Sequence, residues 1–109
     1  RGRKYRRALL MAGWVAVLRA DPRFPESHSL KEKRHHLRSA KAQLQNRFGA
    51  AVAETDHHDV WQRAELTAAL TGRSARDVEQ LAADAERWLH GQAWEVAHVD
   101  VRLVSTDDE

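Results

Sequence analysis

The chain of 109 residues has no cysteine, two prolines and five glycines, and 6% of its residues are aromatic. The absence of cysteine excludes disulfides, thiolate catalysis, cysteine-based zinc sites and iron–sulfur clusters. Neither a glycine-rich phosphate loop nor a nucleophile-elbow motif occurs in the sequence. A chain of this length suits one domain with a single hydrophobic core. We therefore expect a small domain that folds without a disulfide, a metal ion or a cofactor.

Long apolar runs are also missing. The segment from Ala8 to Leu18 follows a basic stretch, as in a signal peptide, but it is too short to cross a bilayer. Arg19 and Asp21 place charges where a cleavage site would need small residues. We expect no membrane association and interpret residues 1–10 as a basic extension, either a cloning remnant or translated upstream sequence, with Met11 as a natural start. A second interpretation of this extension is an arm that binds nucleic acid.

The net charge of +2 hides a strong segregation of charge along the chain. Residues 1–10 carry a net charge of +5, residues 11–22 carry none, residues 23–47 carry +5 and residues 48–109 carry −8. Such polarity can steer an anionic partner toward one side of a nearly neutral protein. The alternative interpretation is a solvated basic helix face beside solvated acidic loops.

The first half of the chain predicts a strand and a helix. Residues 14–20 are apolar and rich in β-branched side chains, and Asp21-Pro22 is expected to end this strand. Ser29 and Glu32 form a capping-box pattern, which predicts a helix that begins there and ends before Gly49. Its apolar stripe consists of Leu30, Leu37, Ala40, Leu44 and Phe48, and most of its basic residues lie off that stripe.

The second half predicts a hairpin, a helix and a final strand. Residues 51–55 and 60–70 are expected to be strands joined by a tight polar reversal at residues 56–59. Alternation in the later strand predicts that one face points to the core, and its residues are Gln62, Ala64, Leu66, Ala68 and Leu70. Ser74 is expected to cap a strongly amphipathic helix that closes at Gly91, and the last strand is expected at residues 94–104. Residues 105–109 are expected to be a frayed acidic tail.

This order of elements predicts an α+β fold of the ferredoxin-like βαββαβ type over residues 11–104. In such a sandwich, two helices cover one face of an antiparallel four-stranded sheet. The right-handed crossover rule places the third strand between the first and the second. The end of the first strand, the start of the first helix and the hairpin at residues 56–61 are then expected to meet at one edge of the domain.

The same segments carry a family resemblance. Ser29-Leu30-Lys31-Glu32-Lys33-Arg34 and Asp59-Val60-Trp61-Gln62-Arg63-Ala64, with Val17-Leu18-Arg19 and Val52-Ala53-Glu54, resemble the YlxP-like family of bacterial proteins, domain of unknown function 503. The resemblance covers about Met11 to Val104. It implies a ferredoxin-like fold and a cytoplasmic protein that is often encoded near genes for translation and ribosome maturation. It implies no catalytic residues.

The meeting edge is a candidate surface for RNA or for a ribosome-associated protein. Free N–H groups and the positive dipole end of a helix attract phosphate, and neighbouring cations add to this attraction. Trp61 could stack on a base, whereas the residues after it lack the interleaved aromatics of the common RNA-recognition motif. We expect contacts through the RNA backbone, and the candidate residues are Lys31, Lys33, Arg34, Arg38, Trp61 and Arg63.

Two other classes of function are alternatives to RNA binding. The helix-free sheet face, with Val15, Val17 and Trp61, could pack against a second copy of the chain and form a homodimer. An enzyme or a metal site at residues 56–59 is less favoured, because adjacent residues in an extended segment point in opposite directions. We expect no catalytic activity.

Overall fold

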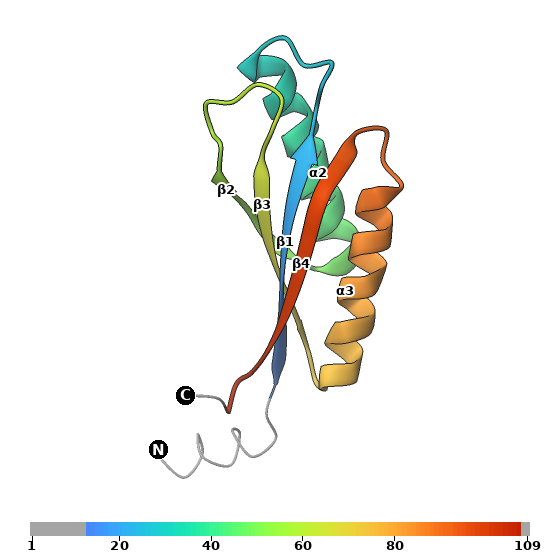
Figure 1. Ribbon diagram of the computed structural model, residues 1–109. Helices are drawn as coiled ribbons and strands as arrows, with labels where there is room; N and C mark the ends of the chain where they lie inside the picture. Colours follow the sequence, from blue (N-terminus) through green and yellow to red (C-terminus); the bar gives the residue numbers. More distant parts are fainter. Residues whose placement is uncertain (1–12, 108–109) are drawn as a thin grey trace.

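The computed structural model describes residues 13–107 and divides them into six elements (Figure 1). In chain order these are β1 (Trp14–Arg23), α2 (Leu30–Phe48), β2 (Ala51–Asp56), β3 (Glu65–Gly72), α3 (Ala75–His90) and β4 (Glu95–Ser105). The predicted order of strands and helices is confirmed. The basic extension at residues 1–10 and the last two residues of the acidic tail lie outside the described residues.

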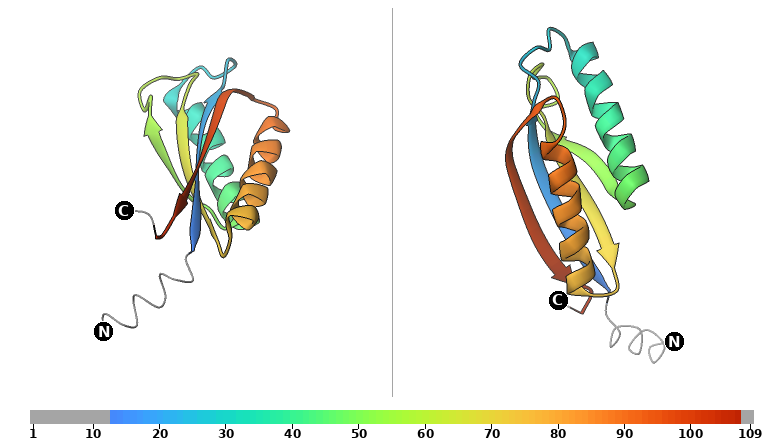
Figure 2. Two further views of the ribbon diagram at one scale, coloured as in Figure 1. Left: turned by 60° about the horizontal axis from the view of Figure 1, so that its bottom comes forward. Right: turned by 90° about the vertical axis from the view of Figure 1, so that its right-hand side faces the viewer.

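The four strands form one antiparallel sheet in the order β2-β3-β1-β4. Both helices lie on the same face of this sheet, and the two views in Figure 2 show the other face free of helices. The third strand in the chain pairs with both the first and the second, as the crossover rule predicts. The structure therefore confirms the α+β ferredoxin-like architecture.

The core lies between the sheet and the helices. Alternate residues of β1 point toward the helices, and Ala16, Leu18 and Ala20 are all buried. Residues 64, 66, 68 and 70 are buried in the same way, as predicted for this segment. Gln62, which the same alternation placed in the core, is exposed because it lies in the loop before β3. The buried residues that α2 and α3 contribute to the core are Leu37, Ala40, Leu44, Val78, Ala82, Ala85 and Leu89.

The two ends of α2 follow the predicted capping pattern. The Ser29 hydroxyl accepts a hydrogen bond of 3.1 Å from the Glu32 N–H, and the Glu32 carboxylate accepts one of 3.0 Å from the His28 N–H. At the other end Gly49 adopts the left-handed conformation, with φ of 66°, and its N–H donates to the carbonyl of Gln45. These local bonds fix where α2 begins and ends.

Most strand boundaries differ from the sequence-based expectation, several by one or two residues and two by more. β1 continues to Arg23, because a register shift between Ala20 and Pro22 lets the strand pass the proline. β3 begins at Glu65 and not at Val60, so residues 57–64 form a loop. At the other end of the domain the N–H of Thr106 donates to the Gly13 carbonyl at 3.0 Å. β4 ends at Ser105, one residue beyond the expected end of the last strand, and Thr106 is hydrogen-bonded to the start of the domain.

Candidate nucleic-acid interface

Lys33 joins the start of α2 to the loop at residues 57–64. Its side chain is fully buried, and its Nζ donates hydrogen bonds to the carbonyls of His57 at 2.7 Å, Arg63 at 3.2 Å and His58 at 3.3 Å. The three N–H donors of an ammonium group thus match three backbone acceptors. The expected meeting of the helix start with the residues after β2 is confirmed by these contacts.

Glu54 provides the opposite charge. Its Oε2 lies 3.1 Å from Lys33 Nζ, and the carboxylate comes from the side of β2 that faces α2. Oε2 accepts no hydrogen bond of good geometry from the described residues, because the ammonium donors are taken by the carbonyls. The pair is therefore held by Coulomb attraction in a site with little water, where such attraction is stronger than at the surface.

The expectation that Lys33 contacts RNA is wrong. A side chain that is 0% exposed and bonded to three carbonyls cannot reach a phosphate group without leaving its site. The residue is a structural cation that fixes the loop. Its hydrogen bonds also explain why β3 begins late, since the carbonyls of residues 57, 58 and 63 bond to a side chain.

Asp21 holds a second group of cations at the end of β1. Arg63 donates two hydrogen bonds to its carboxylate, from Nε at 3.3 Å and from Nη2 at 3.1 Å. Arg23 donates a third at 3.2 Å. Burial acts to raise the pKa of Asp21, but the hydrogen bonds and charges of the two arginines outweigh it and hold this pKa below its ordinary value. Arg63 is thus engaged within the protein, and we do not count it among the cations available to a ligand.

The pKa of Asp21 predicts a dependence of stability on acid. A carboxylate with a lowered pKa stabilises the folded state above its ordinary pKa of about 4, and this contribution is lost as the pH falls through the folded-state pKa. Asp21→Asn should lower the free energy of unfolding by about 1 kcal/mol at pH 7. Urea unfolding should show the gap between this variant and the parent protein closing below about pH 4. A constant gap down to pH 2.5 would contradict the role of the charge.

Four cations of α2 form one continuous flank, separate from Arg47 near the helix end, which contacts Gln43 and Trp88. Lys31, Arg34 and Arg38 are exposed and Lys41 is partly exposed, and we call these four residues the basic flank. At about 100° per residue, Arg34 and Arg38 lie on the side of the helix opposite His36. Within residues 13–107 none of the four makes an ion pair or a hydrogen bond through its side chain. By contrast, Arg19 and Arg63 are paired with aspartates.

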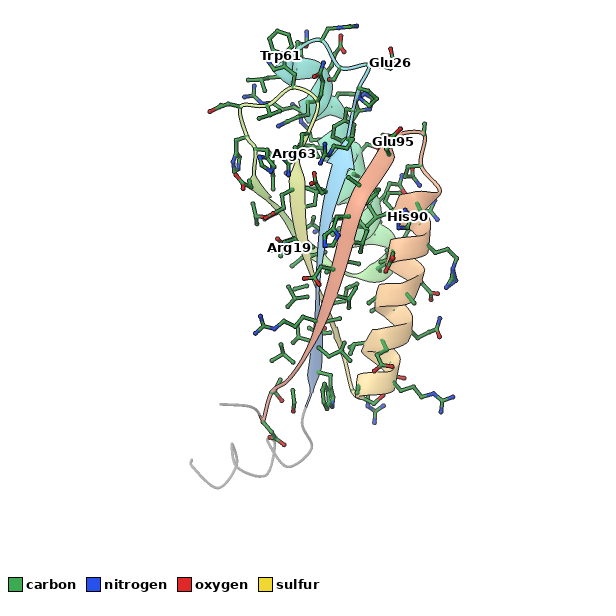
Figure 3. The ribbon with its side chains drawn as sticks, in the orientation of Figure 1. Arg19, Glu26, Trp61, Arg63, His90 and Glu95 are labelled. Atoms are coloured by element: carbon green, nitrogen blue, oxygen red, sulfur yellow. The ribbon has the colours of Figure 1, made fainter. Side chains whose placement is uncertain are left out.

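Trp61 lies in the loop and not on a strand. Figure 3 shows it at the tip of the molecule, where α2 begins, and the residue is 50% exposed. Its neighbour Val60 is 43% exposed. The expectation that Trp61 contributes to the helix-free sheet face is wrong, because β3 starts four residues later. Its ring remains accessible for stacking.

The histidines of the loop have structural roles. His57 adopts a left-handed backbone with φ of 63°, and its carbonyl is the closest acceptor of Lys33. His58 Nε2 lies 3.2 Å from the Glu54 carbonyl oxygen. In the part of the chain that the structure describes, no three metal-ligating side chains are grouped in a way that could hold an ion.

The spacing of residues along α2 contained a signal for the burial of Lys33. The signal was missed because lysine is usually an exposed residue. Residues 33, 37, 40 and 44 follow the spacing of one helix face, and the last three are apolar and buried. Glu54 likewise alternates with Val52 on the core side of β2. A lysine and a glutamate at core positions of adjacent elements indicate a buried pair.

Neither α2 nor α3 has an apolar stretch of the length and hydropathy needed to cross a bilayer. No curated protein matches the chain closely enough to count as a relative. The model of one protein family, described as a protein of unknown function (DUF503), matches residues 15–103. This match runs from the second residue of β1 almost to the end of β4 and includes the basic flank, Lys33 and Trp61. The chain therefore belongs to the DUF503 family.

Proposed function

We propose that this protein is a non-enzymatic RNA-binding protein that uses the basic flank and Trp61. The observation that carries the proposal is the division of the cations into two groups. In the first group, Lys33 bonds to backbone carbonyls, and Arg63 and Arg19 form ion pairs with aspartates of the same chain. The basic flank has no such contacts with the described residues, and a row of unpaired cations along a helix suits a chain of phosphates.

The loop at residues 57–64 adds an exposed aromatic side chain, Trp61, to the proposed binding surface. Lys33 holds the backbone on both sides of Trp61, at residues 57, 58 and 63. An exposed aromatic ring on a restrained loop can stack on a base with a small loss of conformational entropy. A strand of RNA would then run from Trp61 past Lys31 and along α2. The resemblance to a family encoded near translation genes agrees with RNA or a ribosome-associated particle as the target.

The first test is the salt dependence of binding. Fluorescein-labelled single-stranded RNA of mixed sequence should bind at low salt, and its affinity should fall as KCl is raised. Phosphate contacts by the three exposed residues of the flank, Lys31, Arg34 and Arg38, predict a slope of about −2 in a plot of log affinity against log salt concentration. An absence of binding at low salt, or an affinity that does not change with salt, would contradict the proposal.

Trp61→Ala separates stacking from charge. Loss of one base stack should weaken binding of single-stranded RNA about tenfold and leave the salt slope unchanged. Val60→Ala is the matched control, because it truncates an exposed apolar side chain on the same loop. Fluorescence anisotropy on the same RNA measures both variants. Equal losses for the two variants would indicate a general effect on the loop.

The helix-free sheet face supports homodimerisation as a second candidate function. Val15, Val17 and Ala69 lie side by side there, since Val17 pairs with Ala69, and no described helix covers them. An apolar sheet interface is insensitive to salt. A molar mass of two chains by light scattering, unchanged between low and high salt and reduced to one chain by Val17→Lys, would support this function. Dimerisation and RNA binding use different surfaces and are compatible.

A further inference from the structure

A pocket with aromatic walls lies at the same end of the domain as Trp61, on the other side of α2 from the basic flank. Its volume is about 310 Å³, and its lining includes Phe24, His36 and Trp94. The His36 ring stacks on Phe24 with the ring centroids 5.4 Å apart and the planes inclined by 8°. Trp94 meets Phe24 edge to face at 5.5 Å. We call this the aromatic pocket.

The charge at the aromatic pocket is negative. Glu26 and Glu95 belong to its lining, and Figure 3 shows Glu26 near the tip of the molecule and Glu95 below it, at the start of β4. Both residues are exposed, and neither side chain forms an ion pair or a hydrogen bond with any residue from 13 to 107. Aromatic rings combined with free carboxylates attract cations and repel the phosphates of RNA. The pocket therefore differs in ligand preference from the basic flank.

A guanidinium group fits this chemistry better than an ammonium group. It is planar, it stacks on aromatic rings, and it donates paired hydrogen bonds to a carboxylate. The apolar stem of an arginine side chain would also contact Pro25 and Trp94, which line the pocket and are at least partly exposed.

The surface continues beyond the pocket. A second depression of about 300 Å³ shares Pro25 and Glu95 with it and extends to Arg23 and Gln62. A neighbouring depression of this size gives room for the backbone on one side of the inserted residue. This continuity favours a peptide segment over a free small molecule.

We propose that the aromatic pocket receives an arginine side chain from an extended segment of a protein partner. The proposal does not depend on RNA binding, because none of the pocket residues belongs to the basic flank or to the loop with Trp61. A protein built in this way presents a surface for phosphate on one side of α2 and a surface for a basic peptide on the other.

Short peptides test the pocket in the whole chain of 109 residues. The probes are acetyl-Gly-Arg-Gly-amide and the same peptide with citrulline, which keeps the shape of arginine and lacks its charge. Titration of the ¹⁵N-labelled protein should shift the indole signal of Trp94 and the backbone signals of Glu26 and Ser27. The arginine peptide should bind at least about tenfold more tightly than the citrulline peptide.

Two variants and one control locate the interaction. Glu26→Gln combined with Glu95→Gln should weaken the arginine peptide about tenfold, because two exposed charges are lost without a change in shape. His36→Ala should weaken it by removing one wall. Glu79→Gln combined with Asp107→Asn removes the same charge elsewhere and should leave the affinity unchanged.

Several results would overturn the proposal. They are equal affinities for the arginine and citrulline peptides, equal losses in the double variant and its control, and the absence of any shift at Trp94. Guanosine 5′-monophosphate is the third probe. If it shifted the same signals at lower concentration than the arginine peptide, the pocket would be a nucleobase site.

Discussion

Lys33→Met is expected to lower the free energy of unfolding by about 3–5 kcal/mol, as the removal of one partner from a buried ion pair does. Methionine keeps an unbranched apolar stem of nearly the same length and lacks the terminal ammonium group, so most of the loss comes from that group. Without it the carbonyls of His57, His58 and Arg63 lose a common donor, and Glu54 is left as a largely buried charge without a cation. Urea denaturation followed by circular dichroism measures the effect.

Two comparisons isolate the role of this lysine. Lys31→Met alters an exposed lysine two residues away and should change stability by less than about 0.5 kcal/mol. Adding Glu54→Gln to Lys33→Met should recover part of the loss, because the double variant no longer carries an uncompensated charge. A Lys33→Met protein that is as stable as the parent would show that the buried contacts do not hold the loop.

Replacement of Lys31, Arg34 and Arg38 by glutamine is expected to weaken RNA binding about 100-fold at low salt and to flatten the salt slope by about 2. Each residue is exposed and unpaired among the described residues, so its removal costs the fold little. Glutamine preserves helix propensity in α2. Binding is measured by anisotropy on the labelled RNA, and stability is measured in parallel by urea denaturation.

The matched control removes the same charge from other places on the domain. Arg73, Arg76 and Arg102 are also exposed and make no ion pair within residues 13–107. Their triple replacement by glutamine should weaken RNA binding only slightly, through the lower net charge. If both triple variants lost affinity equally, attraction would arise from overall charge, and the basic flank would not be the binding surface.

Most of the fold could be predicted because its signals are local. The capping pair Ser29 and Glu32 and the left-handed Gly49 each act within a few residues of the helix ends. The alternation of buried residues along β3 was equally readable. The loop at residues 57–64 could not be predicted in the same way, since three of its backbone carbonyls bond to a side chain 24 to 30 residues away in the chain.

The sequence by itself determined the βαββαβ order, the helix boundaries and the concentration of basic residues on α2, because propensity, capping and periodicity act over a few residues. Only the tertiary structure decided what each cation does. Lys31 and Lys33 are chemically identical and two positions apart, yet one is exposed and the other is buried beneath the loop. The physical reason is that an ammonium group can leave water only where distant segments supply acceptors and a counter-charge, and those partners meet only in the folded chain.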